Sequence, residues 1–453
     1  MSVAHVVVES PPLPTLRDVP TPILSLLALG VLAFFSWLVY SGLPFTPKQH
    51  GRKLGVETSN LADAYRHGTE ASHAGQWKVK GLWIFPVKSC RGIEIAEARV
   101  VPSGLEHDRQ FVFLTPLFYY SVKNKNKNFE RIINQPAQMF AEWMPNAKTG
   151  DLQWVFITQR QYPKMALITT KIYLEGEHDG NLHITFPIKS RLPFLKRART
   201  IRFPLSVSDE FKARYPLKKV GIWREQPVAY DISSAVETEL RELSAYLCTD
   251  GPLALFRVCP EELREVYRNA PTANEAGYQP VTGFADAVHI TPYLLIPPPS
   301  FITRTATDHW WREQYPLHML NLTSVRELNS RITDKIPKLD IVRFRANIIP
   351  TLFKVTGPGP FTEDDWKKIR LGAHVYYAAC RTLRCKMPNV DPDTGERHMQ
   401  EPDQTLRSYR AIDPGYRHGA CLGMQLVPAG SMGILRAGDG VDVLETGPHH
   451  YIY

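Results

Sequence analysis

The segment Cys385–Gly395 reads C-K-M-P-N-V-D-P-D-T-G and combines one cysteine with a dense turn signal. Its D-P-D-T-G part is typical of a tight turn, because Asp bonds its own backbone and Gly adopts positive φ. The preceding residues 366–384 have a pattern that permits a helix. We therefore expect Cys385 where the chain changes direction, with an accessible thiol. A small apolar cysteine buried beside a surface turn is the alternative.

Composition limits the class of protein. The chain has 453 residues, enough for two or more domains, and its 43% hydrophobic and 22% charged residues are typical of a globular protein. Proline is frequent, with 37 residues against 28 glycines, which favours a loop-rich, β-rich body. The net charge of +9 fits an anionic ligand, an anionic membrane surface or nucleic acid. No regular array of basic and aromatic residues occurs, so we expect no nucleic acid partner.

Six cysteines are scattered along the chain, unlike the dense framework of a small secreted protein, which favours a reducing compartment. Cys380 and Cys385 form one loose pair, with His374 and His398 nearby. A structural zinc site needs two close pairs at ligand spacing, so this pattern argues against zinc.

Residues Ile23–Leu43 are 21 uncharged, mostly apolar residues. As a helix they would span roughly 31 Å, which matches a bilayer core of about 30 Å. Three basic residues follow shortly after this segment and one precedes it, so the positive-inside rule places the C-terminal body in the cytosol. We expect a flexible tail at 1–22, a transmembrane helix at 23–43 and a linker at 44–76.

From Trp77 the hydrophobic period changes to that of strands. We expect strands in residues 77–90, 93–101, 110–114 and 182–186, within a β-rich domain at 77–188. The basic, acid-free stretch 189–202 marks a domain boundary, as a solvated connector or as a contact with anionic lipid head groups.

The second domain is predicted at 200–447. Helical spacing occurs in Ser233–Leu247 and Thr323–Ile332. Asp340–Ile349 is predicted to be a strand with Arg343, Arg345 and Asn347 on one face, a combination that can hold an anion. Residues from Pro292 to Leu320 look like an irregular insertion. Gly-rich turns separate short strands in Cys421–Leu444, as in a closing barrel.

Several motifs together resemble the MOSC family, the molybdenum cofactor sulfurase C-terminal domain superfamily, and within it the mitochondrial amidoxime-reducing subgroup. The motifs are W-I-F-P-V-K-S-C-R-G at 83–92, G-L-E-H-D-R-Q-F at 104–111, E-L-N-S-R-I at 327–332, R-F-R-A-N-I at 343–348, R-C-K-M-P-N-V-D-P-D-T-G at 384–395 and L-R-A-G-D-G-V-D-V-L at 435–444. The chain departs from the family at Leu383, where a serine is common, and at Ala346, where a proline is common.

The resemblance implies an α+β fold. A β-barrel-rich MOSC domain follows an N-terminal β-rich MOSC-associated domain, and one transmembrane helix precedes both. It also implies a molybdenum cofactor (molybdopterin) with Cys385 as metal ligand and catalytic residue, and Asp391 as a second catalytic candidate for proton handling. The cofactor-binding positions that it implies are Lys88, Ser89, Arg109, Thr291, Arg345, Asn347 and Thr382.

Two function classes follow from the resemblance. The first is a membrane-anchored oxidoreductase that reduces small N-hydroxylated substrates such as amidoximes. The sequence has no haem, flavin or iron–sulfur motif, so cytochrome b5 and its NADH-dependent cytochrome b5 reductase would supply electrons, and the outer mitochondrial membrane would be the location. The alternative is a cofactor carrier or sulfur-transfer module without turnover. A full sulfurase would need a pyridoxal-phosphate domain, for which there is no room ahead of residue 77. The retained cofactor-site residues argue against a scaffold that has lost its cofactor.

Overall fold

The structure is a computed structural model of the whole chain. It describes residues 21–40, 51–63, 76–116, 154–177, 179–189, 197–221, 226–249, 251–266, 269–284, 315–352, 359–430 and 433–451. The chain divides into two compact units, Met1–His50 and Gly51–Tyr453. The predicted insertion up to residue 314 and the predicted cofactor contact Thr291 lie outside the described residues.

The first unit contains helix α1, Thr21–Tyr40. Its described large apolar side chains are exposed, among them Leu26, Leu29 and Phe35. The sequence predicted a transmembrane helix at 23–43. In the part of the chain that the structure describes, no helix is long and apolar enough to cross a membrane, so the predicted span is not found there.

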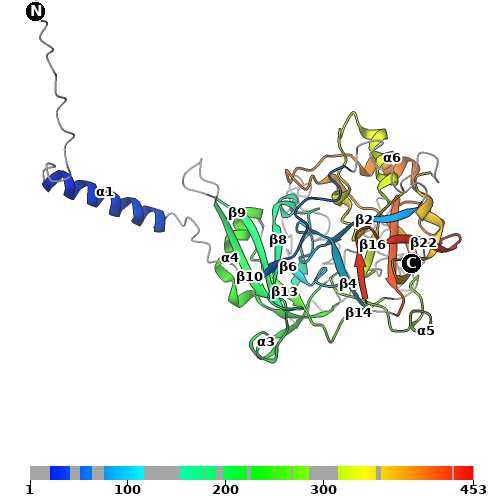
Figure 1. The fold of residues 1–453 in the computed structure, drawn as a ribbon, viewed down its shortest axis with the longest axis horizontal. Coiled ribbons are helices and arrows are strands. Elements are labelled where there is room, and N and C mark those ends of the chain that lie inside the picture. The colour runs from blue at the N-terminus through cyan, green and yellow to red at the C-terminus, as the bar shows by residue number, and fades with distance from the viewer. Residues whose placement is uncertain are drawn as a thin grey trace, which may run out of the picture. The chain divides into compact units, whose positions relative to one another are not determined.

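Seven of the described strands form a closed β-barrel, which lies within the second unit. Around the barrel the order is β17 (Ile348–Leu352), β16 (Leu317–Met319), β20 (Cys421–Pro428), β19 (His374–Leu383), β18 (Trp366–Leu371), β22 (Gly440–Thr446) and β2 (Trp77–Ile84). Strand β2 pairs with β17 and closes the barrel, while β3 (Ile93–Ile95) extends from its other edge. Figure 1 shows the early strand β2 beside the last strand β22. The predicted α+β, barrel-rich architecture is therefore confirmed.

Apolar residues on the barrel strands pack into one continuous core. Leu317, Ile348, Tyr376 and Met424 are each at most 1% exposed and belong to the same cluster. Strand β20 is buried along its whole length, as expected for a strand covered on both faces. Barrel closure removes the unpaired strand edges that would otherwise expose backbone N–H and C=O groups.

Residues 366–384, for which the sequence permitted a helix, form the β18–β19 hairpin instead. Gly372 makes the turn with φ +56°, a conformation that glycine adopts without strain. Valine and tyrosine side chains in β19 pack well on a pleated sheet, and pairing with β20 and β22 satisfies the backbone. Tertiary pairing therefore overrides a helical pattern in this segment.

Two further sheets are formed by strands that lie between Arg52 and Val258. The first has the order β1 (Arg52–Lys53), β8 (Thr169–Leu174), β9 (Gly180–Ile188), β10 (Arg197–Pro204); the second has the order β11 (Leu217–Lys219), β12 (Val228–Asp231), β13 (Ala254–Val258), β6 (Phe111–Pro116), β7 (Trp154–Phe156). Strands β9 and β10 pair from Arg197↔Ile188 to Pro204↔Asn181, so this hairpin crosses the predicted boundary at 189–202. The division into domains at 77–188 and 200–447 stays a prediction.

Smaller elements complete the described chain. They are β4 (Glu97–Val101), β5 (Gly104–Leu105), β14 (Arg264–Glu265), β15 (Val281–Thr282), β21 (Gly433–Arg436), α3 (Asp209–Arg214), α5 (Ala273–Ala276), α7 (Asp403–Tyr409), and the 3₁₀ turns η4 (Pro163–Leu167), η5 (Ser233–Ala235), η7 (Ile341–Phe344), η8 (Thr362–Asp365) and η9 (Met387–Asn389).

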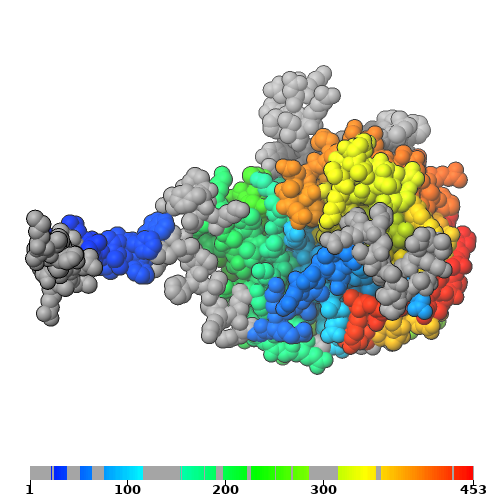
Figure 2. All heavy atoms as spheres, turned by 45° about the horizontal axis from the view of Figure 1, so that its top comes forward, coloured from blue at the N-terminus to red at the C-terminus, as the bar shows by residue number. Residues whose placement is uncertain are grey.

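Both helices predicted from 3.6-residue periodicity are confirmed. Helix α4 spans Glu237–Leu247, buries Leu240, Leu243 and Leu247, and lies against β9 and β10 (Figure 1). Helix α6 spans Leu322–Ile332 and buries Leu328 and Ile332. It contacts α7, and Figure 2 shows the yellow α6 region bordered by orange residues from later in the chain.

The predicted strand Asp340–Ile349 is wrong except for its last two residues. Residues 341–344 form η7, because the Asp340 side chain accepts the Val342 N–H at its start and Arg345 ends it at φ +56°. Strand β17 begins only at Ile348. Arg343, Arg345 and Asn347 therefore do not share one strand face.

Candidate functional site

One pocket of about 500 Å³, including its open mouth, lies where the ends of several barrel elements meet. Four segments that are distant in sequence contribute its main walls: the turn before β6, strand β16, the residues between η7 and β17, and the end of β19. Its lining residues are Arg109, Tyr315, His318, Phe344, Arg345, Asn347, Thr382, Leu383, Arg384, Cys385, Met387 and Gln425. Five predicted site residues, Arg109, Arg345, Asn347, Thr382 and Cys385, thus come together here.

Two buried arginines and a buried amide form one wall. Arg109 Nη1 donates to Asn347 Oδ1 at 3.1 Å and pairs with the Asp108 carboxylate, while Arg109 Nη2 donates to the Arg345 carbonyl at 3.1 Å. Arg345 Nη1 donates to the Cys90 carbonyl at 2.5 Å. Both guanidiniums lie over the Phe85 ring, at 5.0 and 4.2 Å from its centroid. The fixed positive charge and rigid donor geometry suit an anionic ligand.

The backbone at both arginines has an unusual conformation. Arg109 has φ +48° and Arg345 has φ +56°, in the left-handed region that non-glycine residues seldom occupy. Such a conformation costs of order 1–3 kcal/mol and persists only where surrounding contacts enforce it. Its presence at two pocket residues supports a functional reason for this geometry.

The opposite wall is the end of β19 and the residues that follow it. The Cys385 thiol is half-buried and not in a disulfide, whereas Cys380 earlier in the strand is fully buried. The Thr382 side chain is 3% exposed, and its Oγ1 has no hydrogen-bond partner among the described residues. A buried hydroxyl without a partner is costly, so it indicates a polar ligand in the pocket. Leu383, in place of the family's common serine, makes this part of the wall apolar.

Three other predicted site residues lie outside the pocket lining. Lys88 is 1% exposed, donates to the Phe284 carbonyl at 3.2 Å and lies over the Phe156 ring. Ser89 is buried at φ +63°, and its hydroxyl has no partner among the described residues.

Asp391 organises the turn after Cys385. Its Oδ1 accepts the N–H groups of Asp393 at 2.8 Å and Thr394 at 3.1 Å, and its Oδ2 pairs with Arg343. Both carboxylate oxygens are therefore engaged in holding the turn, and this placement favours a structural role.

Sequence reasoning missed seven lining residues, of which His318 and Arg384 are polar neighbours in the pocket. Arg384 Nη1 lies 3.3 Å from His318 Nε2, and Arg384 Nη2 donates to the Phe344 carbonyl at 3.0 Å. Arg384 precedes Cys385 directly, which is a usable sequence signal. No sequence signal marked His318, because its segment was assigned to an irregular insertion. The structure places it in strand β16.

Burial lowers the pKa of His318 well below its usual range, and the positive charges of Arg384 and Arg109 lower it further. Since the unfolded chain takes up a proton near pH 6.5 and the folded chain does not, the contribution of this group to stability is present above pH 6.5 and is lost as pH falls below it. We expect His318→Gln to reduce the loss of unfolding free energy between pH 7.5 and 5.5 by up to about 1.4 kcal/mol in total. Urea unfolding of the wild type and the variant at both pH values measures this free energy of unfolding. An equal loss in both proteins would contradict the prediction.

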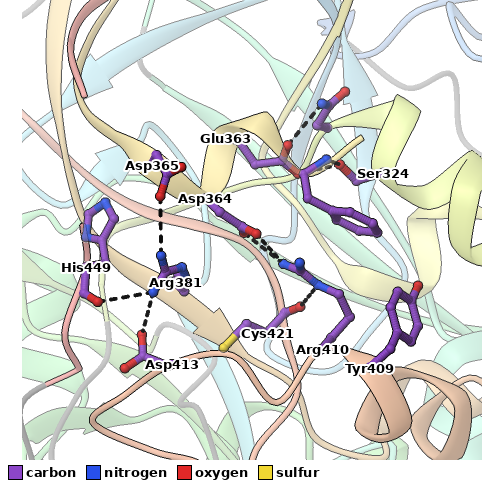
Figure 3. Close-up of polar contacts among 12 residues, drawn as sticks. Ser324, Glu363, Asp364, Asp365, Arg381, Tyr409, Arg410, Asp413, Cys421 and His449 are labelled. Atoms are coloured by element: carbon purple, nitrogen blue, oxygen red, sulfur yellow. Dashed lines mark hydrogen bonds and ion pairs between the residues drawn. The ribbon is translucent and has the colours of Figure 1, made fainter. Parts of the chain in front are cut away.

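A buried charged network supports the strand that carries Thr382 (Figure 3). Arg381 pairs with Asp413 at 3.3 Å and donates to the His449 carbonyl at 3.1 Å. Arg410 donates twice to the Asp364 carboxylate, at 2.8 and 2.6 Å, and to the Cys421 carbonyl at 3.0 Å. These contacts link β19 to the C-terminal residues and β20 to η8.

Comparison with known proteins identifies domain families and relatives that match this chain. Residues 305–442 match the MOSC domain and residues 76–119 match the MOSC N-terminal beta barrel domain. The chain is 25% identical to mitochondrial amidoxime reducing component 2 of Rattus norvegicus over 88% of this chain and 95% of that protein. It is 31% identical to mitochondrial amidoxime-reducing component 1 of Mus musculus over 74% of this chain and 72% of that protein.

A further relative has a different name. Molybdenum cofactor sulfurase of Oryza sativa subsp. japonica is 24% identical over 80% of this chain, but the match covers only 34% of that longer protein. The description of the second domain match, a beta barrel domain, agrees with the β-rich fold. The chain belongs to the MOSC domain family and is similar, within it, to the mitochondrial amidoxime-reducing components.

Proposed function

We propose that this protein is a molybdenum-cofactor oxidoreductase that reduces N-hydroxylated compounds of the amidoxime type. One observation carries the proposal: the half-buried Cys385 thiol lies in the same pocket as the buried arginines Arg109 and Arg345. A thiolate is a suitable ligand for a soft redox metal, and the arginines suit a phosphate. The names of the rat and mouse relatives support the substrate class.

The residues present fit a pterin that carries a phosphate and a metal. Arg109, Arg345 and Asn347 would hold the anionic part, and Cys385 would ligate the metal. The buried Thr382 hydroxyl lacks a partner among the described residues, so it has a hydrogen bond to offer. Lys88 and Ser89 stay predicted cofactor contacts, as does Thr291, and Asp391 stays a predicted catalytic residue.

The bound molybdenum would supply two-electron redox chemistry next to Cys385. The reaction breaks the N–O bond of the substrate, consumes two electrons and two protons, and releases water. The chain's own residues would bind and orient the substrate: Tyr315, Phe344 and Met387 line the pocket with apolar surface that excludes water. This surface favours substrates with an apolar or aromatic body.

The electrons would come from a separate protein. By resemblance to the amidoxime-reducing subgroup we propose cytochrome b5, reduced by its NADH-dependent reductase. NADH oxidation that requires substrate, cytochrome b5 and this chain together would support the assignment. NADH oxidation that is independent of cytochrome b5 would contradict it.

The main test is to measure the molybdenum and pterin content of the full chain after expression in a host that synthesises molybdenum cofactor. We expect about one molybdenum per chain, and conversion of benzamidoxime to benzamidine with a reduced viologen as donor. A folded protein without molybdenum would refute the proposal. A protein that binds molybdenum and passes the cofactor to an acceptor without reducing benzamidoxime would be a carrier or sulfur-transfer module, as the similarity to the rice sulfurase allows.

We also propose that α1 attaches the protein to a membrane. The support is the exposure of its apolar side chains, with Leu26 68% and Phe35 61% exposed, which is unfavourable in water. The outer mitochondrial membrane is the proposed location, by analogy with the relatives' names.

We expect the full chain to float with liposomes in a density gradient and Leu26→Glu/Phe35→Glu to remain at the bottom, because a charge on the apolar surface opposes lipid contact. The matched control is Leu217→Glu, an exposed apolar residue of the second unit. Equal flotation of all three proteins would contradict the role of α1.

A further inference from the structure

The backbone of His318 contacts the wall of the pocket that contains Asn347 and Arg109. It lies in β16, between β17 and β20. Its N–H donates to Asn347 Oδ1 at 3.1 Å, and its carbonyl accepts the Asn347 N–H at 2.8 Å. Asn347 Oδ1 also accepts from Arg109. The backbone of His318 therefore fixes the amide that positions the first arginine of the pocket.

The side chain of His318 connects to the other wall. Arg384 Nη1 lies 3.3 Å from His318 Nε2. A guanidinium can only donate hydrogen bonds, so this contact is a hydrogen bond when Nε2 accepts and the imidazole is neutral, with its proton on Nδ1. Burial and the charges of Arg384 and Arg109 lower the pKa of His318 and favour the same neutral form, while hydrogen bonds to the backbone of Arg345 and Leu422 act in the opposite direction. Together with the Phe344 carbonyl, His318 gives the Arg384 guanidinium two fixed partners.

The backbone of β20 lies close to the imidazole. Gly423 in β20 has φ +83°, and a Cβ there would lie 2.7 Å from His318 Nε2 and 2.5 Å from the Met319 carbonyl. Both distances are too short for a side chain. The backbone of β20 therefore packs directly against the ring and holds it toward Arg384.

We propose that His318 is a positioning residue for anion binding: its imidazole aims Arg384 into the pocket while its backbone aims Asn347 and Arg109 from the other side. The ligand class is a phosphate or pyrophosphate group. Two segments that are distant in sequence, residues 345–347 and 382–385, would thereby be held at the spacing that one anion requires. The inference rests on the pocket of the proposed function but not on its redox reaction.

The test uses the full chain made without molybdenum cofactor, with inorganic pyrophosphate as the probe and calorimetry as the readout. We expect His318→Leu to weaken pyrophosphate binding about tenfold, because one charge-assisted contact of Arg384 is lost. His318→Gln keeps an acceptor at this place and should stay within about threefold of wild type. His450→Leu, at an exposed histidine, is the matched control and should bind as wild type does.

A double-mutant cycle separates positioning from general damage. If His318 acts through Arg384, then His318→Leu should have little further effect in an Arg384→Met background. Additive losses in the cycle, unchanged binding in His318→Leu, or no pyrophosphate binding by the wild-type chain at millimolar concentration would each overturn the inference.

A spectroscopic measurement on the wild-type chain covers the case in which the leucine variant does not fold. Imidazole ¹⁵N NMR at pH 7, with His318 assigned by the signal that disappears in His318→Gln, should show an unprotonated Nε2 and a protonated Nδ1. A protonated Nε2 would overturn the inference. If these results hold while molybdenum content and benzamidoxime reduction fail, the redox proposal alone is refuted.

Discussion

Cys385→Ala is expected to abolish molybdenum-dependent benzamidoxime reduction, down to the rate without protein. The structure places this half-buried thiol in the pocket with Arg109 and Arg345, and the proposed function makes it the protein's ligand to the metal. Cys385 is the only thiol among the described residues that line the pocket, so the variant would lack a thiolate ligand for the metal. Cys385→Ser should be nearly as inactive, because a hydroxyl is a poorer ligand for a soft metal. Turnover and molybdenum per chain are the measurements.

The matched control for Cys385 is Cys248→Ala, which removes an exposed cysteine at the end of α4. It should retain wild-type molybdenum content and rate. Pterin content adds a second readout, since the phosphate contacts stay in place in the Cys385 variants. A Cys385→Ala protein that keeps the wild-type rate would refute the ligand assignment.

Arg410→Met is expected to destabilise the protein by about 3–5 kcal/mol, the usual cost of removing one partner from a buried ion pair. Arg410 makes two hydrogen bonds to Asp364 (Figure 3). Its guanidinium also lies 4.0 Å from the centroid of the Phe361 ring. Without it the Asp364 carboxylate stays buried, and burial already raises its pKa, with the charge of Arg410 acting in the opposite direction. Urea unfolding at pH 7.5 measures the loss.

Two controls test the role of Arg410. Arg370→Met breaks a pair with Asp442 in which the two side chains are 48% and 59% exposed, so we expect a loss below about 1 kcal/mol. Arg410→Met/Asp364→Leu removes both charges and should recover most of the stability, because no buried charge is left alone. Equal losses in the Arg370 and Arg410 variants would contradict a special role for the buried pair.

Local pattern alone predicted the elements whose apolar spacing matches the period of their secondary structure. Helices α4 and α6 follow from apolar residues at 3.6-residue spacing, and β2 follows from alternation. Residues 366–384 were assigned the wrong structure because pairing with β20 and β22 outweighs the local preference. The strand prediction for residues 341–345 was wrong because the Asp340 cap and the left-handed Arg345 form a 3₁₀ turn there. Both features depend on contacts with neighbouring residues.

The sequence by itself determined the family resemblance, the barrel-rich class and the residue types of the pocket, since short motifs carry these. Only the tertiary structure decided which of those residues meet. Arg109 and Asn347 are 238 positions apart, and His318 and Arg384 are 66 apart, so no local pattern records their hydrogen bonds. The tertiary structure also shows that Asp391 bonds to the backbone of its own turn and does not line the pocket. The physical reason is that barrel closure brings strand ends together whatever their distance along the chain.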